Sequence, residues 1–537
     1  MQRVAPLQDI WAFSRFLWGL PAFLKKRMSP AEAAAILRQR LAQRDKNFLH
    51  GLKTILGTQP NPYRALFETA KCEFADVAKI VEQDGIESAL RALRGAGVYV
   101  TFEEFKSRVA MVRDGREIPL TPHSFDNPLQ SRAFHVSTGG STGPGRPVAI
   151  DLEHLWASIP ARLMNDSIHG FIGIPTALWF DDLPGNGPNS VLTRVPYDSV
   201  PERWFSPIAD SDARPALKFR LAQASILGVS RLAGTRLPKP EPVRLDQAAV
   251  IARWAKDALK RHGRCGIKTL VSRALRICLA AEELGIDLTG AIISGGGEPP
   301  TPAKVSVVRR TGARWISNYV MQEIGAVGSC CGNAIDENDQ HLLLDHVALI
   351  AHPRSVPGFD VAVDAFHVTT LLPSARKIML NVELDDYGIV ETRDCGCPWQ
   401  ELGFRTHLRG IRSFRKLTGE GMTLIGTDMV RILEHDLPQR FGGSPLDYQL
   451  LEEEDERGFT RLSIIVSPHV HVPNEGEVVE VVMKALSAAG HAAALSRTIW
   501  GQAGTLRVRR MQPIWTNRGK LMPLHFERHP MRDGAAK

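Results

Sequence analysis

The sequence predicts an α/β protein with a large N-terminal domain and a small α+β C-terminal domain. A chain of 537 residues that is 44% hydrophobic is too long for one ordinary core. Strands and helices alternate over residues 246–317, which indicates a parallel sheet covered by helices. We therefore expect a helical region over 1–125, a core over 126–411 that includes a small β subdomain from about 330, and a lid domain over 412–537.

The first 125 residues are predicted to be mostly helical. Ser29-Pro30-Ala31-Glu32 has the pattern of a capping box with proline at the first helical position, and it opens an Ala- and Leu-rich helix. Two further helical stretches surround residues 70–79 and 86–96. Nothing in this region indicates catalysis, so we expect these helices to pack on the core.

An apolar run near the N-terminus, Ile10–Leu24, is the best candidate for a membrane segment. It is shorter than the about 20 apolar residues needed to cross a bilayer, and Arg15 and Pro21 interrupt it. The basic residues follow the run, whereas a signal peptide has them before it. We expect no transmembrane segment and a helix docked on the body; an interfacial helix with Trp11 and Trp18 facing lipid is the alternative.

The core is expected to begin as a β-α-β-α-β series. Gly263 is a stop signal for the first helix, which Asp246 can cap. Ligands of parallel sheets bind beyond the carboxyl ends of the strands. The turn at 294–300 and the segment 318–323 follow strands, so we expect both at that rim. The predicted elements are helix 246–259, strand 267–270, a helix to about 284, strand 289–294, helix 301–310 and strand 314–317.

The remaining elements divide into a strand-rich part and a mixed part. Strands are predicted for the β subdomain at 342–350, 360–371 and 378–391. The C-terminal domain is predicted to contain helices 427–435 and 475–488 and strands 448–453, 461–466 and 506–513.

Charge and cysteine content exclude two classes of protein. The chain carries 23% charged residues and a net charge of +8, but the basic residues form only short clusters such as Lys25-Lys26-Arg27. A nucleic-acid binder concentrates them on one element, so we expect no nucleic-acid partner and a surface suited to anionic ligands. Seven cysteines are an odd number in a long chain, which argues against a secreted disulfide framework and for a cytoplasmic location.

A glycine- and hydroxyl-rich run is the clearest candidate for a binding loop. It reads Ser137-Thr138-Gly139-Gly140-Ser141-Thr142-Gly143-Pro144-Gly145-Arg146. Glycines let backbone N–H groups approach phosphate oxygens, and Arg146 adds a cation that can fork onto a phosphate. A flexible linker is the alternative. A P-loop is disfavoured because Arg146-Pro147 replaces its lysine and hydroxyl residue.

This run resembles the phosphate loop of the adenylate-forming superfamily, which includes acyl-CoA ligases. More narrowly, the chain is similar to the branch of phenylacetate–CoA ligase and coenzyme F390 synthetase. The family usually has lysine at the place of Arg146 and serine at the place of Gly139. The resemblance extends from about Tyr63 to Lys520 and implies the fold of that family, with a mobile C-terminal domain.

Later motifs occur in the family's order, and the resemblance implies a role for each. Gly296-Gly297-Glu298-Pro299 resembles the turn beside the adenine. Asn318-Tyr319-Val320-Met321-Gln322-Glu323 resembles a motif whose tyrosine lies near the adenine and whose glutamate holds Mg²⁺. Val320 and Gln322 depart from its glycine and hydroxyl residue.

Three single residues complete the set that the resemblance implies. Asp386 stands where the family's aspartate binds the ribose hydroxyls. Arg412 occupies the place of the hinge before the mobile domain. Lys520, in Asn517-Arg518-Gly519-Lys520, matches the lysine that contacts the carboxylate and the α-phosphate. Alone, each would be read as a turn, surface or loop residue.

The chemistry that these residues could perform is activation of a carboxylic acid by ATP. Attack of the carboxylate on the α-phosphate gives an acyl-adenylate, and the protein must hold two anions in line and neutralise developing charge. Lys520 would bridge the carboxylate and the α-phosphate, Arg146 and the loop would hold pyrophosphate, and Glu323 would hold Mg²⁺. A thiol, CoA by preference, then accepts the acyl group. An aryl acid is the default substrate, and a homodimer stays open.

A second group of residues has the composition of a zinc site. Cys331, His341, Cys395 and Cys397 offer three sulfurs and one imidazole, and structural zinc takes four such ligands. Some members of the phenylacetate-ligase-like branch carry a similar arrangement. Cys330 is an alternative to Cys331, and buried free cysteines are the alternative to a metal.

Two other functions stay open. The chain could adenylate an acid and pass the acyl group to a protein or carrier thiol. It could also be a degenerate nucleotide-binding protein without turnover, because Arg146, Val320 and Gln322 depart from the family pattern.

Overall fold

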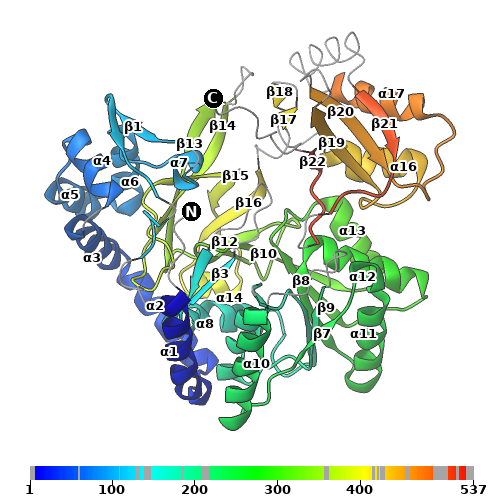
Figure 1. Cartoon of the computed structure of the whole chain (residues 1–537), viewed down its shortest axis with the longest axis horizontal. Coiled ribbons are helices and arrows are strands. Elements are labelled where there is room, and N and C mark those ends of the chain that lie inside the picture. Colours follow the sequence, from blue (N-terminus) through cyan, green and yellow to red (C-terminus); the bar gives the residue numbers. More distant parts are fainter. Residues whose placement is uncertain are drawn as a thin grey trace.

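The α/β class predicted from the sequence is confirmed by a computed structural model of the chain (Figure 1). The structure describes residues 6–58, 61–107, 109–121, 123–127, 134–137, 147–183, 185–207, 217–355, 362–413, 418–419, 422–423, 430–454, 460–487, 506–515 and 519–527. A twelve-stranded sheet and a separate four-stranded sheet organise these residues.

The N-terminal region is helical as predicted, and its capping box is formed. The Ser29 backbone N–H donates to Glu32 Oε2 at 2.7 Å, and the Glu32 N–H donates to Ser29 Oγ. The helices are α1 (Pro6–Lys25), α2 (Pro30–Ala42), α3 (Arg44–Gly57), α4 (Pro62–Ala70), α5 (Phe74–Asp84), α6 (Ile86–Gly95) and α7 (Phe102–Phe105), followed by the hairpin β1 (Met111–Arg113) and β2 (Arg116–Ile118).

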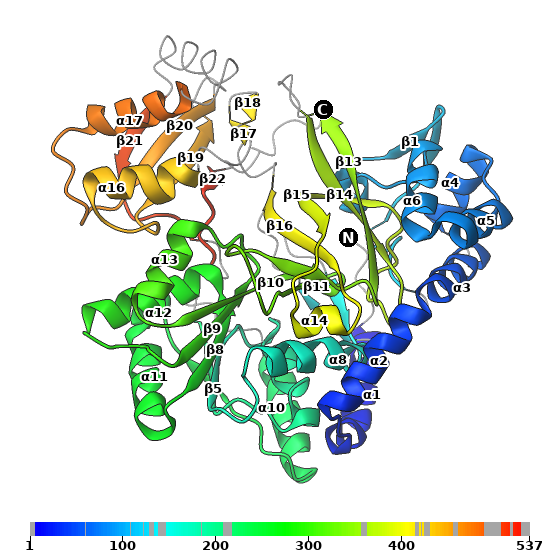
Figure 2. The ribbon, with the colours of Figure 1, turned by 180° about the vertical axis from the view of Figure 1, so that it is seen from behind.

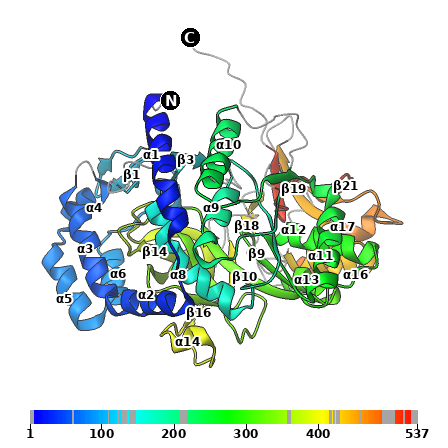
Figure 3. The ribbon, with the colours of Figure 1, turned by 90° about the horizontal axis from the view of Figure 1, so that it is seen from below.

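Helix α1 is docked on the body. Phe16, Leu20 and Phe23 are buried in one cluster with residues of α8 (Leu152–Ile168) and α10 (Leu217–Leu232). Figure 3 shows α1 beside these two helices. Trp18 stays exposed on the outer side. Among the described residues, none of the helices combines the length and the apolar character that a bilayer span requires.

The large sheet has a parallel half and an antiparallel half. Its order is β13-β14-β15-β16-β12-β11-β10-β9-β8-β5-β6-β7, and pairing is parallel from β10 to β7. The parallel strands are β5 (Thr176–Trp179), β6 (Arg203–Ser206), β7 (Pro240–Pro242), β8 (Cys265–Leu270), β9 (Ala291–Gly296) and β10 (Arg314–Met321). The antiparallel strands are β11 (Gly325–Cys330), β12 (Gln340–Leu342), β13 (Val347–Ser355), β14 (Ala362–Thr370), β15 (Val382–Thr392) and β16 (Thr406–Ser413).

The strands expected in a small β subdomain are hydrogen-bonded into this same sheet. β12 joins them to the parallel half, because it pairs with β11 on one side and β16 on the other. β15 and β16 therefore stand close to the rim formed by β9 and β10 (Figure 2).

Helices cover both faces of the parallel half. On one face, α11 (Ala249–His262), α12 (Val271–Glu283) and α13 (Pro302–Arg310) pack against β8, β9 and β10. The first of these begins after the 3₁₀ turn η3 (Leu245–Gln247), so Asp246 does not cap it, while Gly263 ends it with φ +71° as predicted. Elsewhere on the sheet, α9 (Gly187–Leu192) contacts β5 and α8 contacts β11, while η2 (Val195–Tyr197) and α10 pack with α8 in one hydrophobic cluster and α14 (Pro398–Glu401) lies by β11.

The C-terminal residues form the second sheet, of order β21-β20-β19-β22. Tyr448, Ile464 and Val478 are buried in its own hydrophobic cluster. The elements are the π-helix η5 (Ile432–Asp436), α16 (Leu437–Phe441), β19 (Tyr448–Glu454), β20 (Thr460–Val466), α17 (Glu475–Ser487), β21 (Leu506–Arg510) and β22 (Leu524–Glu527). The last strand was not predicted. Short hairpins β3 (Phe134–Ser137) with β4 (Pro147–Ile150) and β17 (Thr418–Gly419) with β18 (Met422–Thr423) complete the described elements.

Candidate functional site

The turn after β9 lies at the carboxyl rim of the parallel strands. Gly297 has φ +77°, a conformation that L side chains rarely adopt. At Gly296 a Cβ would come to 2.7 Å from the Asn318 carbonyl oxygen of the neighbouring strand β10, so the close approach of the two strands requires glycine there. Glu298 is buried and its carboxylate accepts a hydrogen bond from the Ser272 hydroxyl of α12. Glycine is therefore required at both positions by backbone geometry.

Lys520 reaches this turn from the C-terminal region. Its Nζ donates to the Gly297 carbonyl oxygen at 2.6 Å, across 223 residues of sequence. Next to it, the Leu521 N–H donates to Ser272 Oγ at 3.4 Å, so the backbone of this segment is also attached to α12. The structure thus brings the predicted lysine to the predicted adenine turn.

Tyr319 and Asp386 are joined directly. The Tyr319 hydroxyl on β10 donates to Asp386 Oδ2 on β15 at 2.7 Å. Burial and the Asp386 charge raise the pKa of Tyr319 well above its usual value, so the phenol stays protonated. Asn318 points its amide at Ser294 Oγ, at 2.8 Å. Two motifs predicted to contact one nucleotide are therefore neighbours.

Arg412 lies beside the same strand as Asp386. It pairs in register with Tyr387 across β15 and β16. Burial raises the pKa of Tyr387, and the charge of Arg412 and its hydrogen bond to the phenol lower that pKa by less. The predicted hinge residue is thus inside a strand that ends at Ser413.

Glu323 follows β10 and is surrounded by cations. Lys106 Nζ forms an ion pair with Glu323 Oε1 at 2.8 Å, and Arg376 donates to the Gln322 carbonyl oxygen at 3.0 Å. Burial raises the pKa of Glu323, but Lys106 and Lys377 outweigh it and lower the pKa. The carboxylate is therefore ionised, as a Mg²⁺ ligand must be. Lys106 contacts Glu323 Oε1, so Glu323 could hold Mg²⁺ through its other carboxylate oxygen.

The glycine-rich loop falls almost entirely outside the described residues. Ser137 ends β3, whereas Thr138, Gly139, Gly140, Ser141, Thr142, Gly143 and Arg146 lie outside the described residues.

A buried ion pair attaches the C-terminal sheet to the core beside this site. Lys304 Nζ of α13 lies 2.6 Å from Glu434 Oε1 of η5, and both side chains are 6% exposed. The Thr301 hydroxyl donates to the same carboxylate. Burial would lower the pKa of Lys304, but Glu434 and Glu298 outweigh it and raise the pKa. A cavity of about 860 Å³ lies next to this pair, between α12, α13 and the C-terminal residues.

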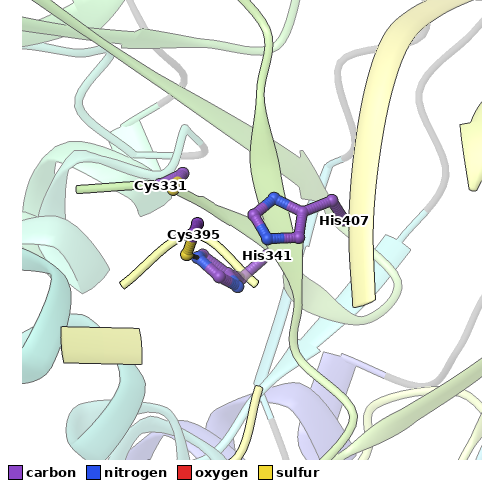
Figure 4. A group of neighbouring side chains, drawn as sticks. All are labelled: Cys331, His341, Cys395 and His407. Carbon is purple, nitrogen blue, oxygen red and sulfur yellow. Dashed lines mark hydrogen bonds between the residues drawn. The ribbon is translucent and has the colours of Figure 1, made fainter. Parts of the chain in front are cut away.

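A cluster of cysteine and histidine side chains lies at β11, β12 and β16 (Figure 4). Ligand atoms of Cys331, His341, Cys395 and His407 all lie within 4.8 Å of one another. Cys397 belongs to the same group, because its Sγ lies 3.1 Å from His341 Nε2. All four predicted ligands are thus brought together, and His407 is added.

The cluster fits a structural zinc ion. Zinc bonds of about 2.0–2.3 Å in a tetrahedron place ligand atoms about 3.5 Å apart. His341 Nε2 lies 3.1 Å from Cys397 Sγ and 3.6 Å from Cys395 Sγ. Hydrogen bonds from Cys331 and then His341 lower the pKa of the Cys397 thiol, which favours a thiolate.

The ring of His407 is oriented by a carboxylate, as the ring of a metal-bound histidine usually is. Its Nδ1 lies 2.8 Å from Asp339 Oδ1, and its buried Nε2 has no hydrogen-bond partner among the described residues. The side chain of Cys330 points away from the cluster, so Cys330 is not one of its ligands. Its thiol contacts the Cys331 carbonyl oxygen, its side chain packs with Phe171, and burial raises its pKa to about 11.

Sequence reasoning missed Lys106, Arg376 and His407. Local spacing does not mark Lys106, which meets Glu323 across 217 residues. Arg376 could have been found as part of the basic doublet Arg376-Lys377, which lies between two predicted strands. His407 is found only through strand pairing, since it lies opposite His341 in β12 and β16.

Comparisons with known proteins give only distant likenesses. No family model matches the chain, and no curated protein matches it. The chain resembles the structure of 2-hydroxyisobutyryl-CoA ligase in complex with 2-HIB-AMP and CoA (14% identity, 94% of this chain and 91% of that chain, TM-score 0.44). It also resembles anthranilate CoA ligase AuaEII in complex with anthranoyl-AMP (10%, 95% and 95%, 0.43). A third is the amide bond synthetase McbA from Marinactinospora thermotolerans (13%, 92% and 98%, 0.38).

Proposed function

We propose that this chain activates a carboxylic acid with ATP through an acyl-adenylate and transfers the acyl group to a thiol, with CoA as the acceptor. The contact of Lys520 with the Gly297 turn carries the proposal, because it joins the last motif of the chain to the nucleotide turn. The Tyr319–Asp386 hydrogen bond beside the turn supports it. Five sequence motifs in the order of the adenylate-forming superfamily agree with it.

The adenylation step forms one bond and breaks one bond. A carboxylate oxygen attacks the α-phosphorus of ATP, and the bond from that phosphorus to the β-bridging oxygen breaks, so pyrophosphate leaves. Lys520 places a positive charge between the two anions, where charge is shared in the transition state. Tyr319 and Asp386 orient the adenine and the ribose, and Arg146 and its loop hold the pyrophosphate.

Magnesium is the cofactor proposed for this step, held by Glu323. When bound, Mg²⁺ neutralises charge on the phosphate oxygens. The ion pair of Lys106 with Glu323 holds the carboxylate in place next to Arg376, which fixes the neighbouring backbone.

The transfer step exchanges an oxygen leaving group for sulfur. The thiolate of CoA attacks the acyl carbon, and the bond from that carbon to the AMP oxygen breaks, which releases AMP and the thioester. In this proposal Arg412 lies at the hinge that lets the C-terminal domain change position between the two steps. We place the chain in the phenylacetate–CoA ligase-like branch and in the cytoplasm.

We also propose a structural zinc ion at the cysteine–histidine cluster. Cys331, His341 and Cys395 are held from three separate segments, and Cys397 or His407 completes the four ligands. The ion would tie the β11–β12 hairpin to the segment before α14 and so support the strands that carry Asp386.

ATP–pyrophosphate exchange over a panel of acids tests the proposal. We expect exchange with at least one acid and none without acid. Product analysis with CoA added should then show a thioester and AMP; formation of the thioester only on a carrier protein would change the acceptor. A panel that covers aryl, aliphatic and dicarboxylic acids and gives no exchange would contradict the proposed activity.

A further inference from the structure

A group of buried charges lies below the rim, on the face of the sheet that α8 covers. Asp166 of α8 is 1% exposed, Lys268 of β8 is 5% exposed, and Arg194 is 3% exposed. Lys268 Nζ lies 2.6 Å from Asp166 Oδ1. Arg194 Nε lies 3.4 Å from Asp166 Oδ2, which also accepts from the Tyr197 hydroxyl at 3.0 Å. Both oxygens of this carboxylate are therefore already in use.

Arg162 adds a further cation to this group. It lies one helical turn before Asp166 on α8, on the same face. Its buried Nε has no hydrogen-bond partner among the described residues. Arg162 lies close enough for its charge to lower the pKa of Lys268 and of Arg376.

The described charges of this group do not balance. Arg162, Arg194 and Lys268 face a single carboxylate, Asp166, while Glu323 is occupied by Lys106. Burial together with Arg194 and Arg162 lowers the pKa of Lys268 to about 7, in spite of Asp166. Buried charge without a counter-charge is unfavourable. Arg194 Nε is held in the ion pair with Asp166, whereas the buried Nε of Arg162 has no hydrogen-bond partner among the described residues.

The register of the strands connects this group to the rim. Lys268, Ser294 and Ile316 are neighbours across β8, β9 and β10, and two residues further on Leu270 pairs with Gly296. Alternate residues of a strand share a face, so Lys268 lies on the side of the sheet that carries Leu270. A Cβ at Gly297 would touch both Leu270 and Lys520. At about 3.3 Å per residue, Lys268 lies about 7 Å below the rim.

We infer that the activated acid carries a second carboxylate, which binds Arg162 and Lys268 while its first carboxylate lies at Lys520. The inference rests on the proposed adenylation. The sequence led us to expect an aryl monocarboxylate as the substrate. We now infer a dicarboxylic acid whose two carboxylates are separated by about the distance from the rim to Lys268. The second carboxylate would supply the missing counter-charge and accept a hydrogen bond from the unpartnered Nε of Arg162.

Matched acids with and without the second carboxylate test this inference. Terephthalate is compared with benzoate, and adipate with hexanoate, in ATP–pyrophosphate exchange. We expect kcat/KM to be at least about 10-fold higher for the diacid of each pair, since hydrogen bonds to charged groups are strong. Arg162→Gln should reduce this ratio to about one, Arg162→Lys should restore part of it, and Arg253→Gln, at an exposed arginine of α11, should leave it unchanged.

Binding without ATP separates this inference from the proposed activity. We expect terephthalate to raise the thermal unfolding temperature more than benzoate, and Arg162→Gln or Lys268→Met to remove the difference. A shift without any exchange would support the dicarboxylate site and contradict the adenylation. Exchange with equal kcat/KM for both acids of each pair, or equal shifts by both acids, would overturn the inference.

Discussion

The rim site and the cysteine–histidine cluster differ in how much of their bonding the protein itself satisfies. At the rim, Lys520, Tyr319 and Asp386 are half-buried and come from segments that meet only through tertiary contacts. In the cluster, His341 and His407 are fully buried and the donor atoms face one another. The first arrangement is open to a ligand that comes and goes, whereas the second is closed, as structural metal sites are. Substitutions should therefore reduce activity at the rim and stability in the cluster.

The largest effect on stability is expected from Cys395→Ser. Loss of one zinc ligand should reduce the free energy of unfolding by about 3–5 kcal/mol, because metal binding and folding are coupled. Metal analysis should show near-stoichiometric zinc in the wild type and much less in the variant. Cys72→Ser, at a cysteine outside the cluster, is the control. Zinc-free wild-type protein that unfolds at the same temperature as the metal-loaded form would show that the cluster does not hold a structural metal.

The largest effect on activity is expected from Lys520→Ala. In the proposed mechanism the Lys520 charge stabilises the transition state, so its removal should slow pyrophosphate exchange about 100- to 1000-fold. Thioester formation from supplied acyl-adenylate should fall far less, and the unfolding temperature should stay within a degree or two. Lys484→Ala, at an exposed lysine of α17, should behave as the wild type. Equal losses in both half-reactions would contradict the assigned role of Lys520.

Glu434→Gln tests the attachment between the two sheets. The variant keeps a hydrogen-bond acceptor for Thr301 but removes the charge that faces Lys304, which should weaken the contact by about 1–3 kcal/mol. We expect this contact to help hold Lys520 at Gly297, so exchange should fall about 10-fold while the second half-reaction is retained. Glu480→Gln on the exposed side of α17 is the control. An unchanged exchange rate would show that the ion pair does not position Lys520.

The smallest effect concerns His169, which lies behind the cluster and donates from Nε2 to the Cys330 carbonyl oxygen. Burial lowers its pKa to about 4 from 6.5. As pH falls below 6.5 the unfolded chain takes up a proton that the folded protein resists, so stability is lost over the window from 6.5 to 4. Between pH 7 and 5.5 this loss is about 1 kcal/mol. His169→Gln should lack it in urea titrations at the two pH values; an identical pH dependence in both proteins would refute the assignment.

Helix starts and ends could be predicted where the residues that determine them are adjacent in the sequence. The capping box at Ser29 and the stop at Gly263 follow from side-chain and backbone chemistry of adjacent residues. The rim motifs could also be named individually from their order. Their contacts could not be derived this way, because Tyr319 and Asp386 meet through the pairing of strands far apart in sequence.

The same reason explains the missed residues. His407 joins the cluster because β16 returns beside β12, and no spacing rule encodes that return. The surplus of charge at Arg162 depends on which residues of α8 face β8, and on Asp166 being already occupied. The strands expected in the β subdomain were identified from their own sequence patterns, but their connection to the parallel half depends on β12, which pairs with β11 on one side and β16 on the other.

The fate of the carboxylate oxygens tests the central claim most directly. An acid labelled with ¹⁸O in both carboxylate oxygens is incubated with the enzyme, ATP and CoA, and the AMP is analysed by mass spectrometry. Attack on the α-phosphorus followed by thiolysis predicts one ¹⁸O in each AMP formed. Unlabelled AMP would contradict acyl-adenylate formation by this chain. So would formation of ADP together with ¹⁸O-labelled inorganic phosphate.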